Sequence, residues 1–465
     1  MLLNTTEFSR SELRELFGAE NTFNLPEFTK GISTDTRTLE HGNIFVALKG
    51  ERFDGHDVLS YACEKGASVL IVDRKYEDKL STEIKSYPHI YVENTLAALG
   101  MFGQFHRNRL AVKVIAIAGA AGKTSTKDLA AHLLSQKFST LKTEANYNNK
   151  IGVPLTLLQL TPEHEVAVIE IGTNEPGEIE ILSRLCNPTH GLITNIGKEH
   201  LEKLIDLDGV EREEIALFSE LSENGGQILL NMDDERLRKY AAIYPNALFF
   251  GIEHQAQVQT AISFNGELQP ALTFMKNGFT VQMQTIGLAA AYNAIAAAAV
   301  GISLGMNGEE IRLGLESFVA PEAHGYGRMN IESVGGCTLI NDCYNANPES
   351  MLIALRTLKL FPTSGKRIAV LGDMRELGES AREEHKTIIA EALSKADEVV
   401  VLGDEMGTAA NHFSRVRIAA SKGECIKMIE EIITNGDVVL VKGSRGMQME
   451  DIITGLKHNA GVIVL

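Results

Sequence analysis

The sequence predicts an α/β fold in three domains: a small N-terminal α/β domain, a central domain with a parallel sheet and a glycine-rich loop, and a C-terminal Rossmann-like domain. A chain of 465 residues is too long for a single hydrophobic core. Its composition, with 44% hydrophobic and 23% charged residues, is that of a globular protein. Short apolar runs alternate with helical stretches, as in parallel sheets. We place the domains at 1–111, 112–318 and 319–465.

Each domain is expected from its own apolar strands. The first domain contains strands at 44–48 and 68–72. The central domain has strands at 114–118, 166–172 and 191–195, and a helix at 126–134. A third unit begins near Pro321 and repeats this design, with strands at 339–342, 368–373, 399–404 and 438–443. Continuous apolar strands lie in parallel sheets covered on both faces. Ligands bind beyond the carboxyl ends of such strands, where Lys123, Glu170 and Asn195 fall.

Charge and cysteine usage exclude several classes of function. Lysine and arginine number 44 against 61 acidic residues, so the net charge of −17 disfavours nucleic acids and anionic membranes as partners. The five cysteines form no C-x-x-C pair, which indicates free thiols in a reducing compartment. The first ten residues show no secretory signal. The uncharged stretch 277–308 is expected as a strand and a buried helix, not as a membrane span. We therefore expect a cytoplasmic protein.

The segment "IAIAGAAGKTSTKD" has the features of a phosphate-binding loop. Its glycines, Gly119 and Gly122, separate a buried strand from a helix whose N-terminus favours an anion. Lys123 can reach terminal phosphates, Ser125 follows in the same turn, and the Thr124 hydroxyl can hold Mg2+, so ATP or GTP would suit the loop. The usual motif has a glycine six positions before the lysine, where this chain has Ile117. The alternative interpretation is a glycine-rich turn that binds no nucleotide.

Polar side chains near two later strand ends are candidates for metal and substrate binding. Glu170 ends an apolar strand, where a carboxylate is costly unless it is paired or holds a cation; the alternative is a strand end in water. His200 closes "TNIGKEH" and can lie opposite Glu170, although a lone surface histidine usually has no special role. Asn148 and Asn149, in "NYNNK", suit phosphate or substrate contact, but turns also favour asparagine.

These motifs together resemble those of the Mur ligase family of peptidoglycan synthesis, and within it the MurF type. The resemblance spans all three domains. It is carried by "STDTRTLEHGNIFVALKGERFDGHD" in the first, by "GAAGKTSTKD", "NYNNKIGVPLTLL", "EIGTNEPGEI" and "TNIGKEHLE" in the second, and by "INDCYNANPESM", "VLGDMRELGE" and "VKGSRGMQME" in the third. The chain lacks D-N-P-R, the signature of the MurE members that take diaminopimelate.

The resemblance implies an ATP- and Mg2+-dependent ligase that joins D-alanyl-D-alanine to UDP-N-acetylmuramoyl-tripeptide through an acyl phosphate. We also expect a monomer. The implied catalytic residues are Lys123, Glu170, His200 and Arg328. Nucleotide contacts would come from Gly119, Gly122, Lys123, Thr124, Ser125, Asn293, Arg328 and Asp342. Substrate contacts would come from Ser33, Thr34, Asp35, Arg37, Asn148, Asn149, Asn345 and Asn347. The Mg2+ ligands would be Thr124, Glu170, His200 and Glu214.

Two positions depart from the family pattern. Glu214 stands where the family has a lysine carried as a carbamate; it either replaces that charge or is an exposed acid in an acidic run. Ala289 and Ala290 replace the His and the first Asn of G-x-H-N-x-x-N, and losing such bonds at about 0.5–1.5 kcal/mol each would weaken ATP binding about tenfold. A related amide ligase and a homologue that binds nucleotides or UDP-sugars without catalysis are the alternative functions.

Overall fold

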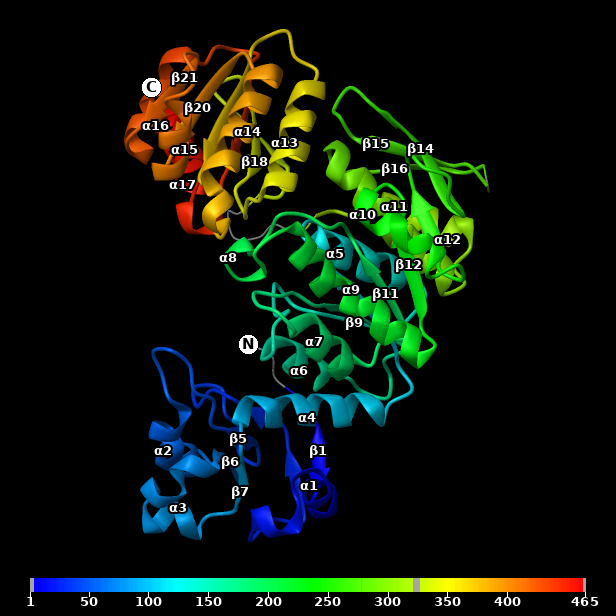
Figure 1. The fold of residues 1–465 in the computed structure, drawn as a ribbon, viewed down its shortest axis with the longest axis vertical. Coiled ribbons are helices and arrows are strands. Elements are labelled where there is room, and N and C mark those ends of the chain that lie inside the picture. Colours follow the sequence, from blue (N-terminus) through cyan, green and yellow to red (C-terminus); the bar gives the residue numbers. More distant parts are fainter. Residues whose placement is uncertain (1–3, 277, 321–326, 463–465) are drawn as a thin grey trace.

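The computed structural model describes residues 4–276, 278–320 and 327–462. Figure 1 shows three α/β units arranged along the long axis of the molecule, in the order of the sequence. The described strands form a small two-stranded sheet and sheets of five, nine and six strands. The three larger sheets each belong to one unit, which agrees with the predicted α/β fold. The predicted start of the third unit near Pro321 lies outside the described residues, and the predicted boundaries at 111 and 318 stay predictions.

The N-terminal unit is built on the five-stranded sheet, with the order β2-β7-β6-β5-β4. Its strands are β1 Glu7–Ser9, β2 Thr22–Phe23, β3 Phe28–Lys30, β4 Ile32–Ser33, β5 Ile44–Val46, β6 Val69–Asp73 and β7 His89–Val92. Its helices are α1 Arg10–Phe17, α2 Leu59–Glu64, α3 Thr82–Ser86 and α4 Thr95–Asn108. The two strands expected at 44–48 and 68–72 are confirmed as β5 and β6.

The central unit carries the nine-stranded sheet, in the order β16-β15-β14-β13-β12-β11-β8-β10-β9. Its strands are β8 Lys113–Ala118, β9 Thr140–Lys142, β10 Val166–Glu170, β11 His190–Ile193, β12 Gln227–Asn231, β13 Leu248–Gly251, β14 Val258–Phe264, β15 Pro270–Phe274 and β16 Thr280–Gln282. Its helices are α5 Lys123–Leu134, α6 Gly152–Leu157, α7 Glu178–Cys186, α8 Leu201–Leu204, α9 Leu207–Asn224, α10 Glu235–Arg238, α11 Gly287–Ser303 and α12 Gly308–Glu316. Strand β8 pairs in parallel with β10 on one side and β11 on the other.

The C-terminal unit has a six-stranded sheet in the order β17-β18-β22-β19-β20-β21, parallel except for the edge strand β17. Its strands are β17 Asn330–Val334, β18 Cys337–Asp342, β19 Arg367–Gly372, β20 Glu398–Leu402, β21 Val416–Ala419 and β22 Val438–Lys442. Its helices are α13 Pro348–Leu360, α14 Ala381–Lys395, α15 Asp404–Ala410, α16 Lys422–Ile432 and α17 Glu450–Val462. All four strands predicted for this unit are present.

The uncharged stretch 277–308 forms β16 and the buried helix α11, as expected, although Asn277 itself lies outside the described residues. Within the described part of the chain, none of the helices combines the length and the apolar character needed to cross a membrane. All five cysteines are free thiols, as predicted.

Helix α4 joins the N-terminal unit to the central one. Its Phe102 ring packs against Phe8, with the ring centroids 5.0 Å apart. Gly103 lies against α6 of the central unit, where a Cβ would stand 2.8 Å from the Cα of Pro154. Because this neighbour is backbone, it cannot turn aside as a flexible side chain can. The close contact between α4 and α6 therefore requires glycine.

We expect Gly103→Ala to destabilise the protein by about 1–3 kcal/mol, because the added methyl forces α4 away from α6. Gly407→Ala is the matched control, since Gly407 also lies in a helix but its Cβ would be 3.4 Å from Ile418, an ordinary contact. This control should be neutral or stabilising by up to about 1 kcal/mol. Thermal unfolding of both variants measures the difference, and equal midpoints would contradict the proposed constraint.

Candidate active site

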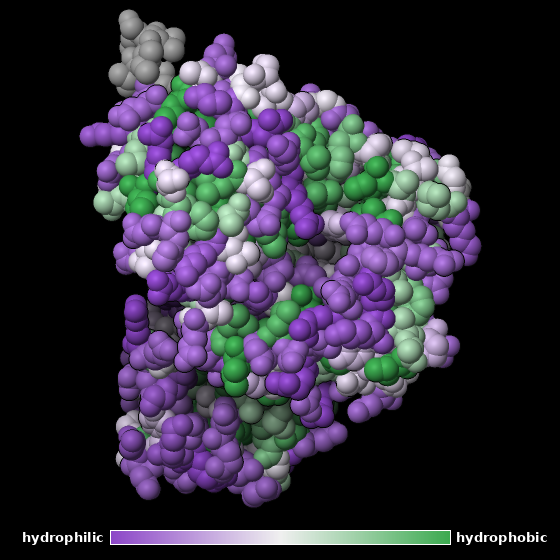
Figure 2. All heavy atoms as spheres, turned by 45° about the horizontal axis from the view of Figure 1, so that its top comes forward, coloured by the Kyte–Doolittle hydropathy of each residue, from purple (hydrophilic) through white to green (hydrophobic). Residues whose placement is uncertain are grey.

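A cleft of about 1580 Å³ lies between the central and C-terminal units. It is lined by the loop after β8, by the residues that follow β10 and β11, and by C-terminal loops that follow β18, β19 and β22. These strands run parallel within their sheets, so the cleft lies beyond carboxyl ends, as predicted. On the face shown in Figure 2 hydrophilic residues predominate, and apolar residues form separate groups.

The glycine-rich loop has the backbone that its sequence predicts. Gly119 has φ +114°, and a Cβ there would overlap the Thr194 hydroxyl. Gly122 has φ +85°, and a Cβ would lie 2.9 Å from the Asn293 Oδ1. Helix α5 starts immediately afterwards at Lys123. Ile117 is still part of β8, in register with Glu170. The turn begins at Gly119, so no glycine is needed at Ile117.

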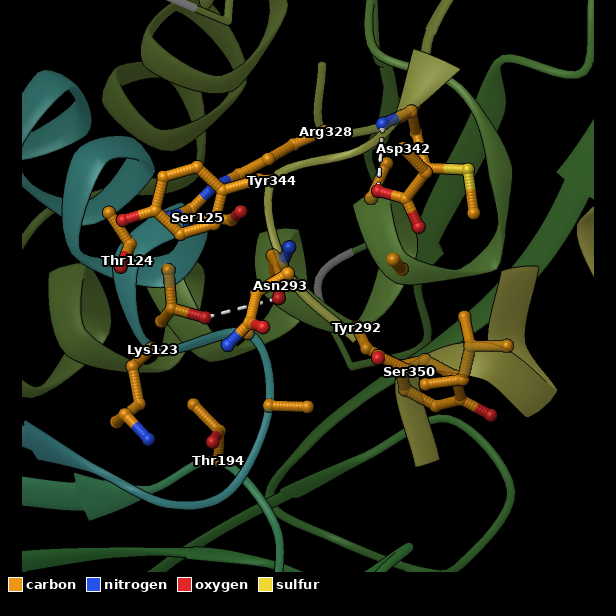
Figure 3. A pocket seen from close by; sticks show the side chains of 18 of the residues that line it. Lys123, Thr124, Ser125, Thr194, Tyr292, Asn293, Arg328, Asp342, Tyr344 and Ser350 are labelled. Atoms are coloured by element: carbon orange, nitrogen blue, oxygen red, sulfur yellow. Dashed lines mark hydrogen bonds between the residues drawn. The ribbon is translucent and has the colours of Figure 1, made fainter. Parts of the chain in front are cut away.

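Lys123 lies within a group of carboxylates. Its Nζ donates to the Gly119 carbonyl and to Glu199 Oε2, the latter at 3.2 Å. Burial alone would lower the pKa of Lys123, but Glu199, Glu214 and Glu170 together raise it above its usual value. Lys123 therefore stays charged. Figure 3 shows it beneath the start of α5, with Thr124 and Ser125 above it.

Glu214 is fully buried, so the alternative of an exposed acid is wrong. Neither of its carboxylate oxygens accepts a hydrogen bond from a described donor. Burial, and then the nearby Glu199 carboxylate, raise the pKa of Glu214 well above its usual value, although Lys123 opposes this shift. Two neighbouring buried carboxylates repel each other, so either one of the pair is protonated or the site requires a cation.

Glu170 is also buried, so the alternative of a strand end in water is wrong. Its Oε1 accepts from Thr124 Oγ1 at 3.0 Å and from Asn148 Nδ2 at 2.8 Å. Its Oε2 has no hydrogen-bond partner among the described residues, and the buried Lys127 ammonium lies 4.0 Å from it. Burial lowers the pKa of Lys127.

The four predicted metal ligands do not form one ready-made centre. Thr124 and Glu170 are in contact, but His200 pairs through Nδ1 with Glu376 Oε2 of the C-terminal unit at 2.6 Å. Within the described ranges, no three His, Cys, Asp or Glu side chains come together as a metal site. The donors nevertheless suit Mg2+, because Glu170, Glu199 and Glu214 all have buried carboxylate oxygens that no described residue hydrogen-bonds.

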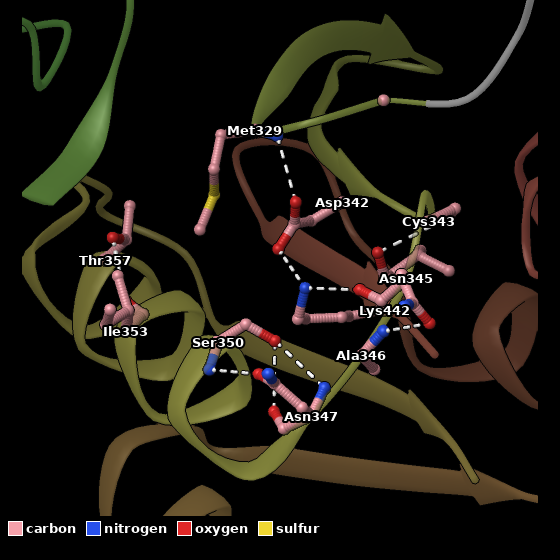
Figure 4. Close-up of polar contacts among 12 residues, drawn as sticks. Met329, Asp342, Cys343, Asn345, Ala346, Asn347, Ser350, Ile353, Thr357 and Lys442 are labelled. Atoms are coloured by element: carbon pink, nitrogen blue, oxygen red, sulfur yellow. Dashed lines mark hydrogen bonds and ion pairs between the residues drawn. The ribbon is translucent and has the colours of Figure 1, made fainter. Parts of the chain in front are cut away.

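The C-terminal wall of the cleft holds the other predicted contacts. The Arg328 guanidinium lies 3.8 Å from the centroid of the Tyr344 ring (Figure 3). Asp342 Oδ2 accepts from Lys442 Nζ at 2.6 Å, and this ammonium also donates to the Asn345 carbonyl (Figure 4). Asp342 and Asn345 are therefore fixed by Lys442.

Several predicted asparagines hold local structure. Asn347 caps α13 through Ser350 N at 2.9 Å, and its Nδ2 donates to the Ala120 carbonyl in the phosphate loop at 3.2 Å. Asn149 accepts from the backbone of Ile151 and Gly152 at the start of α6. Asn293 accepts from Thr126 Oγ1 at 3.2 Å. Asn347 therefore connects the two units directly.

Ala289 and Ala290 line the cleft on α11, near Tyr292. The Tyr292 hydroxyl donates to Glu253 Oε1 at 3.4 Å. Burial, and then Glu253, raise the pKa of Tyr292 to about 12, so this phenol is neutral at physiological pH. Tyr292 is thus the polar group closest in the chain to the two substituted positions.

The predicted N-terminal contacts lie at the end of β4, in the five-stranded sheet. Ser33 Oγ donates to the Asp35 carbonyl at 2.9 Å. Thr34 stands between them, and Arg37 pairs with Asp35 at 2.5 Å while its side chain is 83% exposed. The roles of these four residues stay predictions.

The site contains two further charged residues that the sequence motifs do not single out, Glu199 and Lys127. Glu199 directly precedes His200, and Lys127 lies one helical turn after Lys123. The spacing of four positions between Lys123 and Lys127 was a usable signal, because residues four apart share a helix face. No spacing rule pairs Glu199 with Lys123, because they are 76 positions apart.

The fold and the loop together define an α/β protein of the P-loop class, with its phosphate loop in an interdomain cleft. Family models match along most of the chain: the Mur ligase family catalytic domain at 29–107, the Mur ligase middle domain at 117–301 and the Mur ligase glutamate ligase domain at 327–445. The chain belongs to the Mur ligase family, and within it to the MurF type.

Named relatives and solved structures extend this result. The chain is 33% identical to the UDP-N-acetylmuramoyl-tripeptide–D-alanyl-D-alanine ligase of Bacillus subtilis, over 92% of this chain and 93% of that one. It is 34% identical to the Escherichia coli ligase of the same name, over 96% of both. MurF from Acinetobacter baumannii superposes with a TM-score of 0.87 at 29% identity, covering 98% and 100% of the two chains. The complex of Thermotoga maritima MurF with ADP superposes with a TM-score of 0.83 at 26% identity, covering 93% of this chain and 98% of that one.

We expect Glu214→Gln to stabilise the ligand-free protein at pH 8 by about 1–3 kcal/mol, because it removes a buried carboxylate without a hydrogen-bond partner. The folded-state pKa of Glu214 is raised, so the wild type loses stability as the pH rises from about 4.5, the ordinary value, to the folded pKa. The gain should therefore shrink towards pH 5. Thermal unfolding across this pH range is the measurement.

Glu213→Gln is the matched control. Glu213 accepts from Gly177 N and Ile179 N at 2.7 and 2.8 Å, at the start of α7. Its loss should destabilise the protein by about 1–2 kcal/mol. A Glu214→Gln variant that is also destabilised at pH 8 would show that the carboxylate is satisfied in the folded protein.

Proposed function

We propose that this protein is an ATP-dependent ligase that joins D-alanyl-D-alanine to UDP-N-acetylmuramoyl-tripeptide, in the synthesis of peptidoglycan precursors. The observation that carries the proposal is the charged lysine of the phosphate loop, placed among buried carboxylates in a cleft between two units. The relatives bearing this activity in their names match the chain over nearly its whole length.

The chemistry requires an activated carboxylate, because a free one is a poor electrophile. ATP, when bound, supplies the phosphoryl group that turns the tripeptide carboxylate into a good acyl donor. Lys123 neutralises negative charge at the loop, and the first turn of α5 presents its backbone N–H groups there. Arg328 adds a second cation from the opposite wall. These groups stabilise the charge that develops during transfer.

Mg2+ is expected to be held by Glu170 and Thr124, with Glu214 and Glu199 supplying further carboxylate oxygens. The ion would bring charge neutralisation to the transferred phosphate. Asn148 orients Glu170 through its bond to Oε1 and leaves Oε2 free for a cation. His200 would use its Nε2, because Glu376 pairs with its Nδ1 and so orients the ring.

The UDP end of the substrate is assigned to the N-terminal unit, with Ser33, Thr34, Asp35 and Arg37. Arg37 is the exposed cation of this group and suits a diphosphate. Asn149, Asn345 and Asn347 are proposed to contact the peptide, while Asn293 and Asp342 would contact the nucleotide. We further propose that the protein acts as a monomer in the cytoplasm.

Phosphate release from ATP with Mg2+ tests the proposal. We expect release only when UDP-N-acetylmuramoyl-tripeptide and D-alanyl-D-alanine are both present, with formation of the pentapeptide product. Lys123→Ala should lower turnover at least about 100-fold, because it removes the cation at the developing charge. Binding of ATP and UDP-tripeptide by the wild type without any release would instead indicate a homologue that binds without catalysis.

Arg328→Ala tests the role of the C-terminal wall of the cleft separately from that of the phosphate loop. We expect turnover to fall about 10- to 100-fold, because one charge-assisted contact to the nucleotide is lost. The affinity for UDP-N-acetylmuramoyl-tripeptide, measured by calorimetry, should change less than about twofold, since the UDP end is assigned to another unit. A parallel loss of UDP-tripeptide affinity would contradict the assignment of Arg328 to ATP.

A further inference from the structure

The C-terminal wall of the cleft carries a cation, Arg375, that forms no ion pair with the residues that the structure describes. Arg375 follows β19, is exposed and lines the cleft. Among the described residues, no carboxylate lies within ion-pair distance of its guanidinium. Two other cations of this wall are neutralised: Lys442 pairs with Asp342 at 2.6 Å and Arg445 with Glu450 at 3.0 Å. In a chain of net charge −17, such an unpaired guanidinium is a ready site for an anion.

The backbone around Arg375 is held firmly. Its N–H donates to the hydroxyl of Ser444 at 2.8 Å, and the Ser444 N–H donates to the Asp373 carbonyl at 3.0 Å. Ser444 is itself buried. These bonds connect the loops that follow β19 and β22, two neighbouring parallel strands. Arg375 therefore starts from a fixed point at the carboxyl edge of the six-stranded sheet.

Gly446 leaves the space that the guanidinium occupies. A Cβ at this position would overlap Arg375 Nη1, so the guanidinium lies directly against the Gly446 backbone. A side chain at this position would push the guanidinium away. The position of the Arg375 guanidinium thus depends on Gly446, which carries no charge and can be mutated independently.

Arg375 lines the same cleft as the phosphate loop. Its neighbour Glu376 pairs with His200 at 2.6 Å, and Glu199, next to His200, bonds to Lys123 at 3.2 Å. Two other cations of this wall have different surroundings. Arg328 stacks on Tyr344, and the charge of Arg356 acts on Tyr292 of α11. Arg375 therefore belongs to the segment of the C-terminal wall that contacts His200 through Glu376, and its own guanidinium enters the cleft beside Gly446.

We propose that Arg375 binds the C-terminal carboxylate of the incoming dipeptide. This inference rests on the proposed ligase function. The dipeptide reacts through its amine, and its carboxylate lies at the other end, about 7 Å away in an extended chain of two residues. A guanidinium binds a carboxylate through two parallel hydrogen bonds, which fixes direction as well as charge. Arg375 would thereby point the amine towards the phosphate loop.

The test compares D-alanyl-D-alanine with D-alanyl-D-alaninamide, which lacks the charge. Binding is measured by calorimetry on the protein saturated with UDP-N-acetylmuramoyl-tripeptide, Mg2+ and a non-hydrolysable ATP analogue. Phosphate release is measured in parallel with ATP. We expect the wild type to bind the amide about 10- to 100-fold more weakly than the acid. Arg375→Gln should bind both dipeptides with the weak affinity that the wild type has for the amide.

Three further variants sharpen the test. Arg375→Lys keeps the charge without the planar fork and should recover part of the preference for the acid. Gly446→Ala should weaken binding of the acid but not of the amide. Arg417→Gln is the matched control, because Arg417 lies in the same unit and pairs with Glu398 at 3.4 Å. This control should leave both affinities unchanged.

The outcomes separate this proposal from the ligase function. A preference for the acid that is lost in Arg375→Gln, without phosphate release by the wild type, would support the carboxylate site and overturn the ligase function. Phosphate release by the wild type, together with an intact preference for the acid in Arg375→Gln, would support the ligase function and overturn the carboxylate site. Failure of the wild type to bind either dipeptide would overturn both. An equal loss of UDP-tripeptide affinity in Arg375→Gln would also overturn the carboxylate site.

Discussion

The site depends on one electrostatic constraint: Glu170, Glu199 and Glu214 are buried around Lys123. Buried carboxylates are tolerated only when they are protonated, paired or bound to a cation. In the ligand-free protein the Lys123 ammonium offsets part of this charge, while four carboxylate oxygens of the three residues have no hydrogen-bond partner among the described residues. The same oxygens are therefore available to a divalent cation. The charged state of Lys123 and the raised pKa of Glu214 both follow from this arrangement.

The second constraint is the contact between the two units that line the cleft. Three polar contacts cross it near the phosphate loop: Lys198 with Glu384, His200 with Glu376, and Asn347 with the Ala120 carbonyl. Each is partly exposed, and such contacts contribute only about 0–1 kcal/mol. A unit held in this way can move when a ligand binds. The contacts therefore orient the C-terminal wall, with Arg328 and Arg375, without fixing it permanently.

The candidate site was predictable where chemistry and local sequence coincide. The strand, glycine loop and helix around Lys123 are contiguous, so their pattern alone located the phosphate loop. Glu170 was predictable because a carboxylate at the end of an apolar strand conflicts with its surroundings. Glu199 was not predictable in this way, because its partner Lys123 lies 76 positions away in the sequence. Arg375 was not predictable because a sequence does not show which charged side chains lack an ion pair among the described residues. The asparagines show the opposite limit: their sequence pattern suits ligand binding, yet Asn347 caps α13 and Asn149 accepts hydrogen bonds from the backbone at the start of α6.

The sequence by itself determined the α/β class, the order of the strands along the chain, the phosphate loop and the family. These depend on hydrophobic periodicity and on short contiguous motifs, which carry their information locally. Only the tertiary structure decided that Glu214 is buried beside Glu199 and that Lys123 lies among three carboxylates. It also decided that Arg375 faces the cleft without an ion pair to any described residue. Burial and charge pairing depend on which distant segments the sheets bring together, and a buried charge changes its pKa and its partners accordingly.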